Sequence, residues 1–353
     1  MPYRLTDRNL SRREFLGFLG CTATAALGTA YVTSISNLAP RAHSSVGLLY
    51  SDIYKRHLTG AGHPESPERC DTIIRALSDL RDRLTDLSPR AATLHEILSC
   101  HQHSYVETVR EDVLSEDSLS TGDTRICPAS FEVALQAAGG AMVAVDAVMT
   151  GRVHRAFCVV RPPGHHASPT RGGGFCIFNN AGIAARYAQQ KYKIGKVAIV
   201  DWDAHHGNGT QQIFYSDGSV FYFSTHQHPG YPGTGQANET GSGQGRGCTL
   251  NCPLPHGAGR KQIVEESFLG KLMPAVAKFK PDLLIISAGF DSRIGDPLGR
   301  FRLEDTDFAD LTRIMMSVAD RYAGGRLVSV LEGGYSLPGL ASATRAHVEA
   351  LMG

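Results

Sequence analysis

The stretch Val197-Ala-Ile-Val-Asp-Trp-Asp-Ala-His-His-Gly-Asn-Gly-Thr210 is the most informative part of the chain for both fold and function. Its first four residues are apolar and mostly β-branched, which predicts a buried strand. Asp201, Asp203 and His205 follow on alternate residues, and side chains two apart on a strand share one face. Buried charge is costly unless it is paired or binds a metal. The pattern therefore predicts a divalent metal site at the end of a strand. The alternative is a loop of solvated acids and histidines.

Three other apolar runs end in the same way, in a glycine-containing turn that presents His, Asp or Tyr. They are Ala156-Phe-Cys-Val-Val160 before Arg161-Pro-Pro-Gly-His-His166, Leu283-Leu-Ile-Ile-Ser287 before Ala288-Gly-Phe-Asp291, and Leu327-Val-Ser-Val-Leu331 before Glu332-Gly-Gly-Tyr335. Ligands bind at the carboxyl ends of the strands in open parallel α/β sheets. The four strand ends therefore predict one site at one edge of a parallel sheet.

Helical segments alternate with these strands. We predict helices over 66–84, 129–149, 179–190, 261–279 and 304–322. Pro67 suits the first turn of the first helix, and Gly151 follows the end of the second. The alternation predicts an α/β fold, a doubly wound parallel sheet with helices on both faces.

The composition fits one large enzyme domain, predicted over residues 46–353. The chain has 353 residues, of which 42% are hydrophobic and 20% charged, so it can bury a large core. A formal net charge of +1 gives no electrostatic footprint for nucleic acid. We therefore expect no nucleic-acid partner. We also expect no integral membrane domain, and the oligomeric state stays open.

Residues 1–45 differ from the rest and are predicted to be a signal segment and linker. Ser11-Arg-Arg-Glu-Phe-Leu16 has the twin-arginine pattern of a bacterial export signal. The weakly apolar run that follows is too short and too rich in Gly and Thr for a membrane span. We expect export to the periplasm as a folded protein. The alternatives are an amphipathic N-terminal helix of a cytoplasmic protein, or lipid attachment at Cys21.

The eight cysteines would permit disulfides in an oxidising compartment. Cys158 and Cys176, however, lie inside core motifs, and we expect them to be free buried thiols. Cys248-x-x-x-Cys252 is a weak zinc-binding pattern, but the chain has no second cysteine pair to complete it, so the two cysteines are interpreted as structural. Cys100-His101-Gln-His103 is interpreted as a loop from a strand to a helix.

Six segments resemble the zinc-dependent histone deacetylase family, which includes bacterial deacetylase-like amidohydrolases and acetylpolyamine amidohydrolases. They are Arg161-Pro-Pro-Gly-His-His-Ala167, Gly174-Phe-Cys-Ile-Phe-Asn179, Asp201-Trp-Asp-Ala-His-His-Gly-Asn208, Tyr231-Pro-Gly-Thr-Gly235, Ser287-Ala-Gly-Phe-Asp291 and Glu332-Gly-Gly-Tyr335. The resemblance runs in order through residues 46–353 and is similar to class II, because Asn208 stands where class I has Asp. It implies the arginase-deacetylase fold, with a central eight-stranded parallel sheet.

The resemblance implies a zinc-dependent amidohydrolase that removes an acetyl or other short acyl group from lysine side chains or similar N-acyl amines. An acetylpolyamine amidohydrolase is the alternative. A non-catalytic acyl-binding module would need a broken ligand or dyad residue, and none is broken.

By the same resemblance, one zinc ion binds to Asp203, His205 and Asp291. Three protein ligands leave a position for water, as in catalytic zinc sites. Oxygen-rich ligands leave iron(II) or cobalt open. The fuller Asp and His cluster of the two-manganese arginases is missing from the sequence, which favours one metal.

The implied catalytic residues are a histidine dyad and a tyrosine. His166 is expected to be the general base and then the general acid, with Asn208 orienting it and Asp201 orienting His165. Asn in place of Asp removes a charge, so His166 should be less basic than in class I relatives. Tyr335 is expected to donate its hydroxyl to the developing oxyanion.

The implied substrate-binding residues form a narrow acyl-lysine tunnel. Phe175 and Tyr231 are its aromatic walls, and Gly174 and Gly333 let the backbone approach the substrate chain. Leu298 stands seven residues after Asp291, where polyamine-specific relatives have an acidic gatekeeper. A leucine does not attract a cationic polyamine, which favours acyl-lysine substrates.

The family also binds structural potassium ions. Asp201 and Ser224 match the first potassium site. The carbonyls of Phe214, Asp217 and Val220 match the second. A cation beside Asp201 would change the electrostatic environment of the His165–His166 dyad.

Overall fold

Eight parallel strands form one sheet in the order β2-β1-β3-β8-β7-β4-β5-β6, which confirms the predicted architecture. The structure is a computed structural model, and it describes residues 45–353. The predicted export signal and Cys21 lie outside the described residues. The strands are β1 (Val46–Leu49), β2 (Leu84–Leu87), β3 (Arg155–Cys158), β4 (Val197–Asp201), β5 (Val220–Gln227), β6 (Thr249–Leu254), β7 (Leu283–Ala288) and β8 (Leu327–Leu331).

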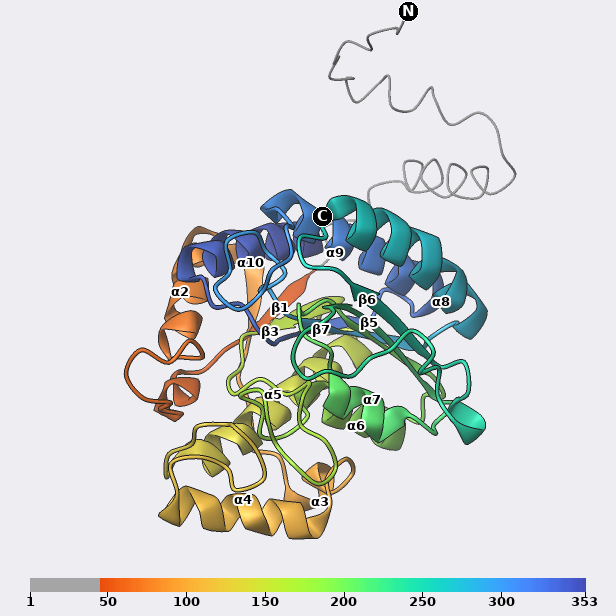
Figure 1. Ribbon diagram of the computed structural model, residues 1–353. Coiled ribbons are helices and arrows are strands. Elements are labelled where there is room, and N and C mark those ends of the chain that lie inside the picture. Colours follow the sequence, from red (N-terminus) through yellow and green to blue (C-terminus); the bar gives the residue numbers. More distant parts are fainter. Residues whose placement is uncertain (1–44) are drawn as a thin grey trace, which may run out of the picture. The chain divides into compact units, whose positions relative to one another are not determined.

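Helices cover both faces of the sheet (Figure 1). The central strands β4, β7 and β8 are buried at every residue, as their near-continuous apolar sequences require. On one face lie α2 (Glu68–Ala76), α8 (Met273–Phe279), α9 (Asp305–Tyr322) and α10 (Leu337–Met352). On the other face lie α5 (Ser130–Met149), α6 (Asn180–Tyr192) and α7 (Asn208–Phe214), with α3 (Leu94–Ile97) and α4 (His103–Ser115) outside them.

Helix α5 is the one helix of the described chain that is long and apolar enough to cross a membrane. Of its most apolar window, 67% is buried inside the protein. Gly140 shows how closely it packs, because an added Cβ would lie 2.7 Å from both Leu49 Cδ2 and the Tyr54 hydroxyl. The burial is that of a core helix packed on the sheet.

Two predictions about local structure were wrong. The helix predicted over 66–84 ends at Ala76, and after a 3₁₀ segment (Ser78–Arg83) the chain enters β2. This edge strand, Leu-Thr-Asp-Leu, has only four residues and a polar centre, so its sequence gave no strand signal. The segment from Cys100 to His103 joins α3 to α4 and not a strand to a helix.

The other predicted helices are present with small shifts at their ends. The segment over 261–279 is a wide π-helical stretch, η5 (Lys261–Leu272), that continues into α8. Asn179 caps α6 by accepting a hydrogen bond from the amide of Gly182. The cysteines within the described residues are free, and Cys158 and Cys176 are buried, as expected.

Candidate active site

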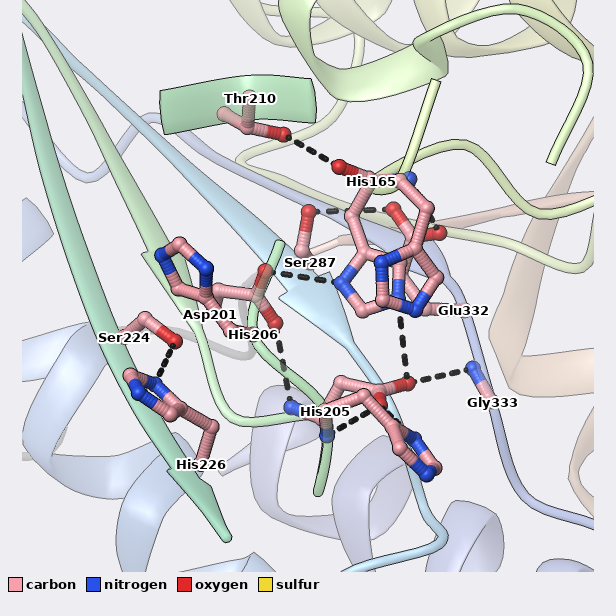
Figure 2. A network of polar contacts seen from close by, with 12 residues as sticks. His165, Asp201, His205, His206, Thr210, Ser224, His226, Ser287, Glu332 and Gly333 are labelled. Atoms are coloured by element: carbon pink, nitrogen blue, oxygen red, sulfur yellow. Dashed lines mark hydrogen bonds and ion pairs between the residues drawn. The ribbon is translucent and has the colours of Figure 1, made fainter. Parts of the chain in front are cut away.

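The four strand ends meet because their strands are neighbours. In the sheet, β3 lies beside β8, β8 beside β7, and β7 beside β4. The register pairs Asp201 with Ser287, and Ser287 with Val330. The turns after these strands therefore open at one edge of the sheet, and their polar side chains converge there (Figure 2).

The three candidate metal ligands lie together in one cluster. His205 Nδ1 is 3.0 Å from Asp203 Oδ1 and 3.0 Å from Asp291 Oδ2. One donor atom of each of the three residues lies within 4.8 Å of the others. Both carboxylates are buried. The other oxygen of each carboxylate accepts a backbone hydrogen bond: Asp203 Oδ2 from the Gly333 amide and Asp291 Oδ1 from the Ala204 amide.

The cluster fits a small divalent cation. Ligand atoms about 2.1 Å from a tetrahedral zinc ion lie about 3.4 Å apart, close to the spacing here. Burial and the neighbouring Asp203 carboxylate raise the pKa of Asp291 to about 7. Two buried carboxylates therefore share this site at a cost that a bound cation would remove.

The two histidines of the dyad have different partners. His165 Nδ1 lies 3.0 Å from Asp201 Oδ2, which also accepts a hydrogen bond from the Tyr222 hydroxyl at 3.1 Å. His166 Nδ1 lies 2.8 Å from Asn208 Oδ1. The ring centroids of the two histidines are 4.0 Å apart.

The surroundings of the two histidines push them towards opposite charge states. Although burial opposes it, the Asp201 and Asp203 carboxylates raise the pKa of His165 to about 10. Burial, followed by the charges of His165 and His205, lowers the pKa of His166 well below its ordinary value. His166 is therefore the neutral member of the pair. Because Asn208 Oδ1 is an acceptor, Nδ1 of His166 carries the proton and Nε2 keeps a free lone pair.

Aromatic rings surround the dyad and the cluster. Tyr231 meets His166 edge-on at 5.0 Å between centroids, and it is 44% exposed, so it also faces outward. Tyr335 packs edge-on against Phe175 at 5.7 Å. Burial raises the pKa of Tyr335 well above its ordinary value, so its hydroxyl remains a donor. The structure thus brings both predicted tunnel walls to the edge that holds the dyad.

Phe175 has a left-handed backbone, with φ of 69°. This conformation costs a non-glycine residue about 1–2 kcal/mol. Paired hydrogen bonds between Gly173 and Cys176 close the turn, and Asp123 Oδ1 accepts from the amide of Gly174 at 2.7 Å. The surrounding contacts hold the aromatic wall in a strained position, as is common at functional sites.

Gly174 and Gly333 are needed by the site itself. A Cβ on Gly174 would lie 2.2 Å from the His166 ring, and one on Gly333 would lie 2.3 Å from Asp291 Oδ2. The prediction gave these glycines contact with the substrate chain. Their contacts in the structure are with the dyad and the metal ligands, and the substrate role stays a prediction.

The residues predicted to bind potassium form two groups, one for each predicted site. Asp201 and Ser224 are register partners on β4 and β5. The amide of Asp217 donates to the Phe214 carbonyl at 3.0 Å, shortly before Val220 begins β5. The Asp217 carboxylate accepts hydrogen bonds from Ser219 and is bound by Arg186. Potassium binding stays a prediction.

Sequence reasoning missed the role of Glu332. This buried carboxylate accepts from the amides of Gly164 (2.7 Å) and His165 (3.1 Å) and from the Ser287 hydroxyl (3.1 Å; Figure 2). Burial raises its pKa to about 7. It ties the dyad's backbone to β7 and β8. A charged residue directly after an apolar strand was the available signal.

A second missed group is the buried ion network of Glu65, Arg69 and Arg161. The Glu65 carboxylate accepts from Arg69 Nη1 at 3.0 Å and from Arg161 Nη2 at 2.8 Å. Although burial opposes it, the two guanidinium groups hold the pKa of Glu65 at about 2. Arg69 also donates to the Gly334 carbonyl at 2.8 Å. The network thus connects the first helix of the domain to the turn that precedes Tyr335.

The sheet and the residues at its edge define a protein of the arginase-deacetylase fold. The chain belongs to the histone deacetylase family, because the family's histone deacetylase domain model matches residues 63–351. A probable deacetylase of Archaeoglobus fulgidus is 39% identical over 316 residues, which cover 87% of this chain and 86% of that protein.

Two further comparisons agree with this family. The human polyamine deacetylase HDAC10 is 40% identical over 303 residues, which cover 82% of this chain and 44% of that protein. The crystal structure of the HDA15 HD domain is 36% identical, with a TM-score of 0.83, covering 88% of this chain and 90% of that one. Together these relatives support a deacetylase that is a hydrolase.

Proposed function

We propose that the protein is a zinc-dependent deacylase that hydrolyses N-acyl amides of lysine side chains or of similar primary amines. The observation that carries the proposal is the His165–His166 pair, biased towards opposite charge states beside the Asp203–His205–Asp291 cluster. A neutral base next to a cation site is an arrangement that supports amide hydrolysis by a metal-activated water.

The cluster would hold the zinc ion, which when bound supplies Lewis acidity towards the acyl carbonyl and towards water. His166 Nε2 takes a proton from the attacking water, and it later gives that proton to the departing amine. Tyr335 donates its hydroxyl to the oxyanion as the carbonyl carbon becomes tetrahedral. The products are the carboxylate of the acyl group and the protonated amine.

Two finer points of the proposal concern the substrate and the compartment. Leu298 at the rim favours acyl-lysine, whereas the similarity to a polyamine deacetylase keeps acetylpolyamines as the second candidate. The Ser11–Leu16 pattern supports action in the periplasm. Cell fractionation with and without substitution of Arg12 and Arg13 tests the export.

Amine release from a panel of acyl-lysines and N-acetylpolyamines tests the proposed function. We expect the zinc-loaded full chain to turn over acyl-lysines. Tyr335→Phe should lower kcat about 10²- to 10³-fold, because it removes one oxyanion donor. Turnover of polyamines alone would overturn the substrate assignment and keep the chemistry. No turnover of either class by the metal-bound protein would contradict the proposed function.

Asn208→Asp should change the pH profile. A carboxylate 2.8 Å from His166 Nδ1 favours the protonated imidazole and so raises the pKa of His166. The base acts only when it is deprotonated, so activity is lost as the pH falls through this pKa. The acidic limb of kcat/KM should therefore move to higher pH in the variant. An unmoved acidic limb would show that His166 is not the titrating base.

A further inference from the structure

Asp296 is an acidic residue outside the metal cluster and the dyad, and its carboxylate accepts four backbone N–H groups. Oδ1 accepts from Leu298 at 2.9 Å and from Gly299 at 3.1 Å. Oδ2 accepts from Tyr335 at 2.7 Å and from Ser336 at 3.0 Å. One side chain thus joins the loop after β7 to the turn after β8.

The two loops that Asp296 joins have different functions in the proposed reaction. The loop after β7 (residues 289–304, called the rim loop) carries Leu298, at the predicted gatekeeper position, and the turn after β8 carries Tyr335, the proposed oxyanion donor. Gln227, at the end of β5, holds the far side of the rim loop by accepting from the Arg300 amide at 3.1 Å. Asp296 is therefore the link between a loop anchored to the sheet and the tyrosine.

Tyr335 needs such a link because glycines precede it. Gly333 and Gly334 give the turn wide backbone freedom, and Gly334 has φ of 120°. Arg69 holds the Gly334 carbonyl on one side of Tyr335, and Phe175 packs against the ring. Asp296 fixes the amide of Tyr335 itself, and with it the direction in which the side chain leaves the backbone.

Only a carboxylate suits this position. Four N–H donors converge on two oxygens, and each oxygen has two lone pairs. An asparagine could accept from one pair of amides at most, and its NH₂ group would face the other pair. Ser336 also begins α10 as its N-cap, so the anion lies at the positive end of a 16-residue helix.

We propose that Asp296 is a positioning residue that aims the Tyr335 hydroxyl at the acyl carbonyl and couples the rim loop to it. The proposal rests on the proposed function, since it assigns Asp296 an effect on that reaction. Misplacing a reacting group by about 1 Å can lower the rate by up to 10²-fold. Loss of the hydrogen bonds to Asp296 should therefore lower kcat.

A double-mutant cycle on acetyl-lysine turnover tests the proposal, with Asp296→Asn, Tyr335→Phe and the double variant. We expect Asp296→Asn to lower kcat about tenfold with little change in KM. In the Tyr335→Phe background the same substitution should change kcat less than about twofold, because its effect acts through the lost hydroxyl. Equal losses in both backgrounds, or no loss in either, would overturn the proposal.

Asp282→Asn is the matched control. The Asp282 carboxylate also accepts two backbone amides, those of Gly195 (3.0 Å) and Lys196 (2.8 Å), but it lies at the opposite end of β7. We expect wild-type kcat from this variant. If Asp296→Asn does not fold, as judged by its melting temperature and metal content, Asp296→Glu keeps the charge, displaces the oxygens and enters the same cycle.

A second readout needs no turnover and separates the two proposals. In protein labelled with fluorotyrosine, the ¹⁹F signal of Tyr335 is the one that Tyr335→Phe removes. Asp296→Asn should shift or broaden this signal, and Asp282→Asn should leave it unchanged. An unchanged signal would contradict the role of Asp296. If the wild type is inactive but Asp296→Asn still shifts the Tyr335 signal, the proposed function is contradicted and the positioning role of Asp296 is not.

Discussion

Replacing His166 with Ala is expected to lower kcat/KM about 10²- to 10⁴-fold, the usual contribution of a general acid–base group. His166 is the neutral histidine of the dyad. Within the dyad, only His166 combines an Nδ1 that is hydrogen-bonded to Asn208 with an Nε2 that has a free lone pair. Zinc binding should be unchanged, because the cluster ligands are intact. Rates from single-turnover assays and metal content give the two measurements.

His256→Ala is the control for this substitution. His256 is an exposed histidine whose Nε2 lies 2.7 Å from the Pro229 carbonyl oxygen. It should keep full activity. A His166→Ala protein that retains metal and loses less than about tenfold in kcat/KM would show that another group takes the proton.

Replacing Glu65 with Gln is expected to lower the free energy of unfolding by about 3–5 kcal/mol, as when one partner of a buried ion network is removed. Arg69 and Arg161 are both fully buried and would lose the carboxylate that neutralises them. Chemical denaturation monitored by circular dichroism measures the change. Activity should fall as well, since Arg69 holds the turn before Tyr335.

Glu107→Gln provides the control for the lost charge. Glu107 pairs with Arg110 on the surface at 3.3 Å, and such pairs contribute about 0–1 kcal/mol. A loss from Glu65→Gln no larger than that of Glu107→Gln would contradict the network's role.

The Glu65 effect should also depend on pH. The folded-state pKa of Glu65 is about 2, below its ordinary 4.5, so ionised Glu65 stabilises the fold. This contribution is complete above pH 4.5 and is lost as the pH falls towards 2. The difference between wild type and Glu65→Gln should therefore shrink over that range. A constant difference would assign the loss to packing.

Much of the fold could be predicted because its central strands are apolar runs bounded by glycine turns. Buried parallel strands carry their own signature in the sequence. The edge strand β2 has a polar centre, and its four residues are paired with β1 alone, so only tertiary contact makes it a strand.

The candidate site, too, could be predicted only in part from the sequence. Asp203 and His205 could be placed together because they closely follow a run that reads as a buried strand, although β4 ends at Asp201 and both residues lie in the turn after it, not on the strand face that the sequence predicted. Their assigned roles, and those of Tyr335 and Asn208, came from the resemblance to the deacetylase family. The roles of Glu65 and Asp296 could not be found, because each depends on a partner that is distant in the sequence: Arg161 for Glu65, and the amides of Tyr335 and Ser336 for Asp296.

We propose that Asp203, His205 and Asp291 hold one metal ion that hydrolysis requires. The most direct test is to remove metal from the full chain with a chelator and titrate zinc back, following amine release and bound metal together. We expect activity to return in proportion to zinc and to saturate at one ion per chain, and we expect Asp291→Asn to regain neither activity nor bound metal. Undiminished turnover by the metal-free protein, or full activity from Asp291→Asn, would contradict the proposal.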